Sequence, residues 1–135
     1  MASELKVDKF TGVTTAGSIS VTGEGNSTTT NLQQGLAKAW TNILYTSAAP
    51  AIQDSFNASS VADTTTGEYT VTLSNNMAND DYVCVSNQQD FAVEHQSPSL
   101  ATSTYAIRTI ADSSGARADI GNGTESYALV SGDLA

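Results

Sequence analysis

The chain has few of the residues on which disulfide frameworks, metal sites and nucleic-acid binding depend. Its 135 residues include one cysteine, Cys84, and one histidine, His95. A single cysteine excludes an internal disulfide framework, and a single histidine argues against a zinc site with several protein ligands. Five Lys and Arg stand against 14 Asp and Glu, a formal net charge of −9. That balance excludes a generic nucleic-acid binder, because neutralising phosphates requires clustered cations.

Long apolar runs are missing as well. No window approaches the roughly 18 to 20 continuous apolar residues of a membrane span. Residues 1–6 contain no apolar core of a secretion signal. We therefore expect a chain that does not insert into a membrane, and no export signal is visible in it.

Threonine and serine are abundant instead. They fill 18 and 17 of the 135 positions, whereas all charged residues together make up 14%. Helix surfaces are usually rich in Glu, Lys and Arg, while Thr alternating with Val, Ile and Tyr favours strands. Aromatic and β-branched residues recur at strand spacing along the chain, which argues against disorder. The sequence predicts a mainly β protein.

The first forty residues, 1–40, are predicted to form a short strand-and-helix stem. Alternating residues in 6–10 and 18–22 indicate two short strands. Residues 27–40 indicate a helix, with Thr30 as N-cap and Gln33 at the position that completes a capping box. A pair of strands and a short helix are each marginal alone in water, so this segment needs a partner surface.

Apolar and small residues form one stripe on the predicted helix, which marks the partner surface. The candidate oligomerisation residues of this stripe are Leu32, Gly35, Leu36, Ala39 and Trp40. Their spacing at i, i+4, i+7 and i+8 puts the large members on one face, and Gly35 permits close backbone approach. The stripe packs either on the body of the same chain or on the same helix of a second copy.

The remainder, residues 41–135, is predicted to be an antiparallel β-sandwich head, jelly-roll-like in its strand spacing. Alternate residues of 68–73 and of 104–110 share one face, which suits a sheet with one buried side. The predicted strands are residues 42–45, 51–56, 68–73, 82–85, 91–93, 104–110, 117–120 and 127–130. The head is acidic, since residues 1–38 carry three acids and three bases and residues 39–135 carry the other 11 acids and two bases.

Candidate catalytic groups do not form a recognisable site. His95 has Asp90 and Ser97 nearby, but all three lie within eight residues, whereas a triad is brought together from separate elements. A pair of carboxylates could cleave a glycan, and Asn79-Asp80-Asp81 could hold a cation or form a plain turn. The carboxylates considered for cleavage are Glu68, Asp80, Asp81, Glu94 and Glu125. We predict a non-enzymatic protein with no catalytic, cofactor-binding or metal residues.

Several stretches resemble small virion proteins of marine tailed bacteriophages, which are commonly described as tail-fibre or structural proteins. The resemblance rests on residues 5–9 and 23–40, followed in the same order by Asp54-Ser55-Phe56-Asn57 and Gly67-Glu68-Tyr69-Thr70-Val71. It covers residues 5 to 73. It implies a protein of the virion exterior, on the tail or the capsid, made in the cytoplasm of a bacterial host. It brings no catalytic residues.

Three functions remain open. A tail-fibre or tail-appendage subunit would attach through its stem and present its head to the host surface. A capsid decoration protein or head fibre would bind and stabilise the shell, which suits a chain this short. The third is a glycan-cleaving tailspike enzyme. Expected partners are the chain itself as a homotrimer, a tail adaptor or the major capsid protein, and a host glycan or protein; no nucleic acid is expected.

Overall fold

The computed structural model describes residues 4–12, 19–23, 28–46, 49–89, 99–110 and 114–135. The chain divides into two units, residues 1–36 and 37–135. The boundary predicted after residue 40 falls inside strand β3 (Ala39–Tyr45). In the part of the chain that the structure describes, no helix has both the length and the apolar character needed to cross a membrane.

The described residues of the first unit form one small hairpin and a single helical turn. Strands β1 (Ser20–Thr22) and β2 (Thr29–Asn31) pair antiparallel, with Val21 opposite Thr30. Helix α1 (Leu32–Gly35) follows directly. Its N-cap is Asn31, whose Oδ1 accepts the backbone N–H of residues 33 and 34 at 2.8 and 3.2 Å, so the predicted cap at Thr30 is wrong by one residue.

The helix predicted within residues 27–40 is wrong beyond its first turn. Leu36, just after α1, already has extended backbone angles, and three residues later β3 begins. The β-branched residues Thr41 and Ile43 favour an extended chain, and β3 pairs on both sides, with β4 (Pro50–Phe56) and β10 (Glu125–Ser131). Two ladders of backbone hydrogen bonds outweigh the helical spacing of the apolar residues.

The strand predicted over residues 6–10 is also wrong. Residues 4–12 are exposed and contain no strand. Alternation between charged and apolar residues favours a strand only where a neighbouring strand can pair with it, and the hairpin of this unit uses β1 and β2 instead.

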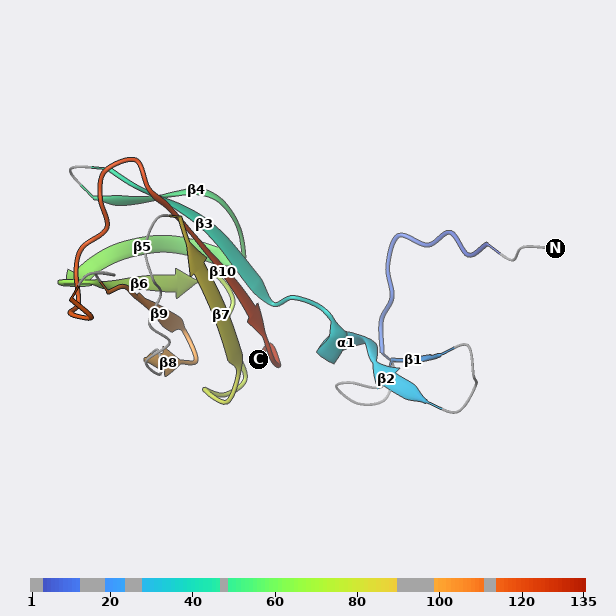
Figure 1. Ribbon diagram of the computed structural model, residues 1–135. Helices are drawn as coiled ribbons and strands as arrows, with labels where there is room; N and C mark the ends of the chain where they lie inside the picture. The colour runs from blue at the N-terminus through green and yellow to red at the C-terminus, as the bar shows by residue number, and fades with distance from the viewer. Residues whose placement is uncertain (1–3, 13–18, 24–27, 47–48, 90–98, 111–113) are drawn as a thin grey trace. The chain divides into compact units, whose positions relative to one another are not determined.

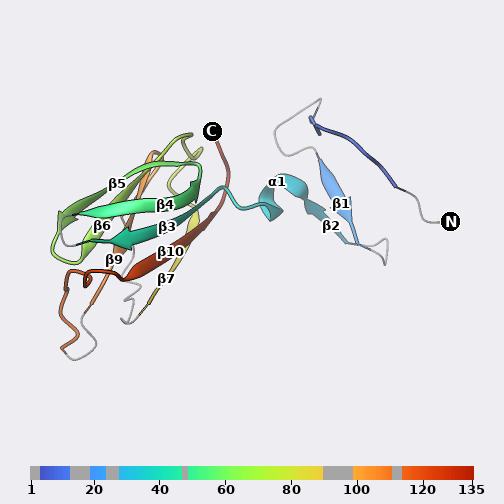
Figure 2. The same ribbon diagram turned by 90° about the horizontal axis from the view of Figure 1, so that it is seen from above.

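In the second unit, the residues that the structure describes form two four-stranded antiparallel sheets (Figures 1 and 2). We call the sheet ordered β4-β3-β10-β7 the first sheet and the sheet ordered β5-β6-β9-β8 the second sheet. The fourth strand of the first sheet, beside β3, β4 and β10, is β7 (Val83–Gln88). The strands of the second sheet are β5 (Ala58–Thr65), β6 (Glu68–Leu73), β8 (Leu100–Ala101) and β9 (Thr104–Arg108).

Consecutive strands form hairpins within a sheet, namely β3 with β4, β5 with β6 and β8 with β9. In a jelly roll, consecutive strands mostly alternate between the two sheets, so the predicted jelly-roll-like strand order is wrong. The prediction of a mainly β, antiparallel fold is confirmed. The chain passes from the first sheet to the second at Asn57, between β4 and β5.

Asn57 holds this corner with its backbone and its side chain. Its φ of 58° is unusual for a residue with a Cβ, and Asn tolerates it better than most. Its side-chain amide donates to the carbonyl oxygens of Lys38 and Asn75, and its Oδ1 accepts the Asn75 N–H at 2.7 Å. The corner therefore ties the start of β3 to the end of β6.

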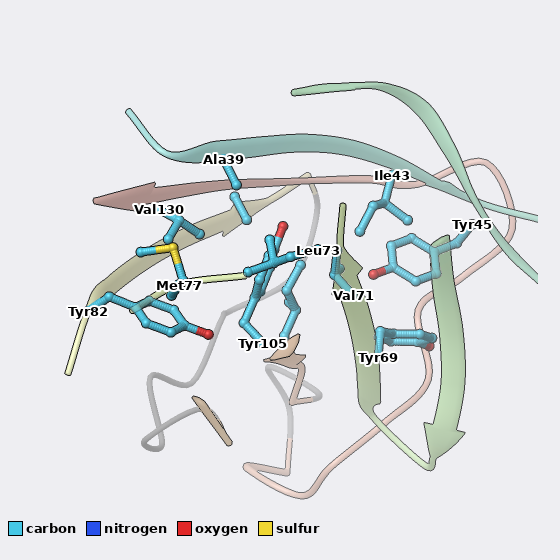
Figure 3. Close-up of a cluster of buried hydrophobic side chains, with 12 residues drawn as sticks. Ala39, Ile43, Tyr45, Tyr69, Val71, Leu73, Met77, Tyr82, Tyr105 and Val130 are labelled. Atoms are coloured by element: carbon cyan, nitrogen blue, oxygen red, sulfur yellow. The ribbon is translucent and has the colours of Figure 1, made fainter. Parts of the chain in front are cut away.

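The core lies between the two sheets, in a sandwich-like arrangement (Figure 3). Tyr69, Val71 and Leu73 of β6 are buried, as the alternation predicts. The rings of Tyr45 and Tyr69, one from each sheet, meet edge to face with centroids 4.4 Å apart. The predicted buried set in β9 and just after it is confirmed too: Tyr105, Ile107 and Thr109.

Most predicted strands of the head are present, with shifted ends. Residues 68–73 coincide with β6, and residues 51–56, 104–110 and 127–130 overlap β4, β9 and β10. Residues 117–120 contribute only an isolated bridge, between Arg117 and Ile110. The prediction over residues 91–93 lies outside the described residues. The sequence pattern does not predict strands β2, β5 and β8.

Candidate functional site

The outer face of the first sheet carries large apolar side chains in the open. In β3 burial alternates strictly, so that Ala39 and Ile43 point into the core while Trp40 between them points outward. In β10 Ala128 and Val130 point inward, and Leu129 points outward. A period of two is what a strand with only one covered face requires, and here the outward positions are apolar too.

The strand register aligns four of these side chains across the whole sheet. Trp40 lies opposite Phe56 on one side and Leu129 on the other, and Leu129 lies opposite Val85. Directly opposite residues have Cβ atoms about 4.5–5.5 Å apart. We call Phe56, Trp40, Leu129 and Val85 the apolar row; their exposed fractions are 50%, 36%, 50% and 55%.

Two further exposed apolar residues, Tyr127 and Val83, lie two positions along β10 and β7 from the row and share its face. Charge is confined to its flanks. The Tyr127 hydroxyl donates to Oε2 of Glu125, which raises the pKa of Tyr127, and Asp54 occupies an outward position of β4. Contiguous exposed apolar side chains of this kind mark interaction surfaces in soluble proteins.

The outer face of the second sheet is polar by contrast. Glu68 of β6 lies opposite Arg108 of β9, and its Oε2 accepts the Arg108 Nε–H at 2.8 Å. Arg117 approaches the same oxygen at 3.4 Å. Beside this cluster the hydroxyls of Thr64 and Thr70 are 2.8 Å apart. These polar groups bond to one another, and the described residues of this face form no apolar row.

The predicted oligomerisation residues do not lie on one helix. Leu32 is half-buried in α1, a Cβ added at Gly35 would have no heavy atom within 4 Å, and Leu36 is exposed. Ala39 is buried in the core of the second unit, whereas Trp40 belongs to the apolar row. The helical stripe is therefore wrong as a surface, although one of its members is at the centre of the observed one.

Sequence reasoning missed the rest of the row. The strand pattern favours core positions for most of the nine aromatics, yet Phe56 and Tyr127 are exposed, and so is Phe10. A signal is present in β10, where apolar residues occupy consecutive positions 127–130. A strand covered on one face needs only alternate apolar residues, so the extra ones indicate a second apolar face.

The residues considered for catalysis do not form a site within the described ranges. His95, Asp90, Ser97 and Glu94 lie outside them. Glu68 is held by two arginines, and the Oδ1 of Asn79 accepts the Asp81 N–H at 3.0 Å, as in a plain turn. Among the described residues, no three of His, Cys, Asp or Glu are grouped so as to hold a metal ion.

Cys84 and a small pocket are two further places where chemistry could occur. Cys84 is partly buried against the core, and this burial raises the pKa of its thiol to about 11, which disfavours the reactive thiolate. A pocket of about 200 Å³ at one end of the sheets is lined in part by Asp63 and Asp119. Asp119 Oδ1 accepts the Gly67 N–H at 2.7 Å, and the Tyr69 hydroxyl accepts the Ile120 N–H at 3.0 Å. These contacts give the pocket lining a structural role.

Comparison with protein-family models, with curated proteins and with solved structures found no match to the chain.

Proposed function

We propose that the protein is a non-enzymatic structural protein of a bacteriophage virion, a tail-fibre or tail-appendage subunit that contributes to attachment at the host surface. The observation that carries an assembly role is the apolar row on the outer face of the first sheet. An exposed row of this kind is an unfavourable surface in water, at about 25 cal/mol per Å² of apolar area, and a neighbouring protein that covers it removes that cost.

The place in a virion rests on the resemblance of residues 5–73 to small phage virion proteins. The mainly β fold, the low content of charged residues and the division into two units agree with an appendage. In this proposal the first unit attaches the protein to the virion, and the second unit presents one sheet face to a neighbour. The partners are further copies of the chain and another virion protein, a tail adaptor or the major capsid protein.

Self-association is part of the proposal, but the helical contact predicted from the sequence does not carry it. The predicted homotrimer depends on a helical stripe, and that stripe is not a single surface. A threefold arrangement stays a prediction, and the apolar row is the surface that a neighbouring chain or another virion protein would cover, because large apolar side chains are exposed there.

Labelling intact virions with gold-coupled antibodies against the second unit, residues 37–135, tests the location. We expect label confined to the tail. Label spread over the capsid shell would instead make the protein a decoration protein, the alternative that a short chain favours. Particles without label, from cells in which the chain is made, would contradict both.

A second experiment tests whether the first unit is needed to attach the protein to particles. A chain shortened to residues 37–135 is expected to fold, because the core is contained within it, but not to join particles. Incorporation at the level of the full chain would refute the role given to the first unit.

A further inference from the structure

Edge strands present unpaired backbone N–H and C=O groups, and proteins usually protect them with charges, proline, bulges or short length. Among the described residues the two sheets have four edge strands, β4 and β7 in the first and β5 and β8 in the second. Three of the four carry such protection. The fourth, β7, carries none.

The protected edges differ in the device they use. β4 begins with Pro50 and contains Asp54, and its register with β3 shifts once. β5 contains Asp63, and its register with β6 shifts twice. β8 is only two residues long. Each device interrupts the regular row of donors and acceptors that another strand would need.

Strand β7 reads Val-Cys-Val-Ser-Asn-Gln over residues 83–88, with no charge, no proline and no glycine. It pairs with β10 over six consecutive residue pairs without a shift. Two of its outward side chains, Val83 and Val85, are among the most exposed apolar residues of the second unit. Six uncharged residues in regular register, at an edge where no described strand pairs with them, are a template for a further strand.

The hydrogen bonding of the adjacent turn shows which backbone groups face outward. The Gln89 N–H donates to the Glu125 carbonyl oxygen at 3.0 Å, which places the odd-numbered residues of this strand toward β10. Because hydrogen-bonding directions alternate along a strand, the N–H and C=O groups of Cys84 and Ser86 face the outer edge of the sheet. Those of Gln88 face the same way, but the Gln88 N–H donates to Asn87 Oδ1 at 2.8 Å.

We propose that β7 pairs antiparallel with β7 of a second copy of this chain, across a two-fold axis at Val85. Opposite residues in an antiparallel pair point to the same face, so a two-fold axis perpendicular to the sheet passes through a pair of identical residues. With Val85 at the axis, Cys84 of each copy lies opposite Ser86 of the other, and these are the residues whose backbone groups face the edge.

The uncharged sequence of β7 and its place at the end of the apolar row favour a second copy as the occupant. Residues 39–135 carry a net charge of −9, so two copies repel each other except where an uncharged surface is presented. β7 is such a surface, and in this register Asp81 falls opposite Gln89 and not opposite another acid. The row from Phe56 to Val85 would then continue into the row of the second copy, with Val85 beside Val85, as one longer apolar surface on the outer face of the joined sheets.

A disulfide test follows from the register. Val85 opposite Val85 is a pair without hydrogen bonds, with Cα atoms about 4.5 Å apart, within the range of about 4.4–6.8 Å that a disulfide needs. The Val83 positions of the two copies are offset by four residues, about 13 Å, too far to bridge. Both side chains are exposed, 55% and 62%, so neither change disturbs the core.

The experiment uses the full chain with Cys84→Ser as background, then adds Val85→Cys or Val83→Cys. Under mild oxidation we expect Val85→Cys to double in mass on a non-reducing gel, while Val83→Cys and the background stay at the mass of one chain. Circular dichroism checks that all three fold alike. Single chains for Val85→Cys, or equal cross-linking at Val83, would overturn the proposal, and a partner strand from another protein would then be the better occupant.

A mass measurement on the chain without added cysteines supports the same test. Val85→Lys places a protecting charge at the axis, and we expect it to halve the native mass, from two chains to one or from a multiple of two to half that number. Unchanged mass would contradict the pairing. Both tests use purified protein in solution, so their failure is distinguishable from a wrong location in the virion.

Discussion

The two sheets of the second unit share a core but differ on their outer faces. The second sheet covers its outside with threonines and with the ion pair of Glu68 and Arg108, whereas the first sheet exposes Phe56, Trp40 and Leu129 in a row. Folding alone explains the inner faces of both sheets. It does not explain the outer face of the first sheet, where polar residues would serve equally well. The difference therefore indicates a task for that face, and the proposed task is assembly.

The largest expected loss of stability comes from raising the pH, because high pH ionises tyrosines buried on the inner faces of the two sheets. Burial, more than the nearby thiol of Cys84, raises the pKa of Tyr82 from 10.0 to about 12, and burial likewise raises the pKa of Tyr45 and Tyr105. A folded-state pKa above the unfolded value gives stability that is complete below pH 10 and is lost as the pH rises through about 12.

We therefore expect cooperative alkaline unfolding, with tyrosinate absorbance rising in step with the loss of circular dichroism. Tyr127, on the outer face, is expected to titrate while the protein is still folded. If all the tyrosines ionised together near pH 10 in a folded protein, the assignment of inner and outer faces would fail.

The next largest loss of stability is expected from shortening one side chain of the core. Ile43→Ala leaves a cavity between the sheets and is expected to lower the free energy of unfolding by about 2–5 kcal/mol, since Ile43 is fully buried. Urea denaturation measures it. A loss below about 1 kcal/mol would show that the two inner faces do not pack as described.

A substitution on the polar outer face of the second sheet is expected to lower the free energy of unfolding by an intermediate amount. Glu68→Gln weakens the charge-assisted hydrogen bonds from the mostly buried Arg108 and from the partly exposed Arg117. We expect a loss of about 1.5–3 kcal/mol in the same denaturation experiment. Glu4→Gln is the matched control, because the pair of Glu4 and Lys6 is exposed and such pairs contribute about 0–1 kcal/mol. Equal effects of the two changes would contradict the structural role of Glu68.

The smallest effect on stability is expected on the outer face of the first sheet. Leu129→Ala removes a side chain that is half exposed, and surface changes of this kind stay within about 0.5 kcal/mol. Denaturation of the variant beside Ile43→Ala checks this. A loss as large as that of Ile43→Ala would make Leu129 a core residue and remove the reason for a docking surface.

The sequence predicted the parts of the fold that alternate strictly. Residues 68–73 form β6 with its buried face, because Tyr69, Val71 and Leu73 are each followed or preceded by a polar residue. Strand β5, a polar edge strand, was not predicted because apolar residues do not alternate along it. The helix over residues 27–40 failed because apolar spacing at three and four residues also fits a strand with both faces apolar, and only pairing decides between them.

The candidate site was predicted least well, for the same reason. The sequence places Trp40 on a surface, but its neighbours there come from β4, β10 and β7, far away in the sequence. Strand register alone brings Phe56, Leu129 and Val85 beside it, and register is set by the complete sheet.

Incorporation of two matched variants into particles tests the central claim most directly. Leu129→Asp places a charge in the apolar row, whereas Ala62→Asp places one on the exposed outer face of the second sheet, opposite Thr70. Each is produced in competition with the unchanged chain, and its share in purified virions is measured by mass spectrometry. The account predicts that Leu129→Asp is excluded and Ala62→Asp is retained; equal incorporation of both, or loss of Ala62→Asp alone, would contradict it.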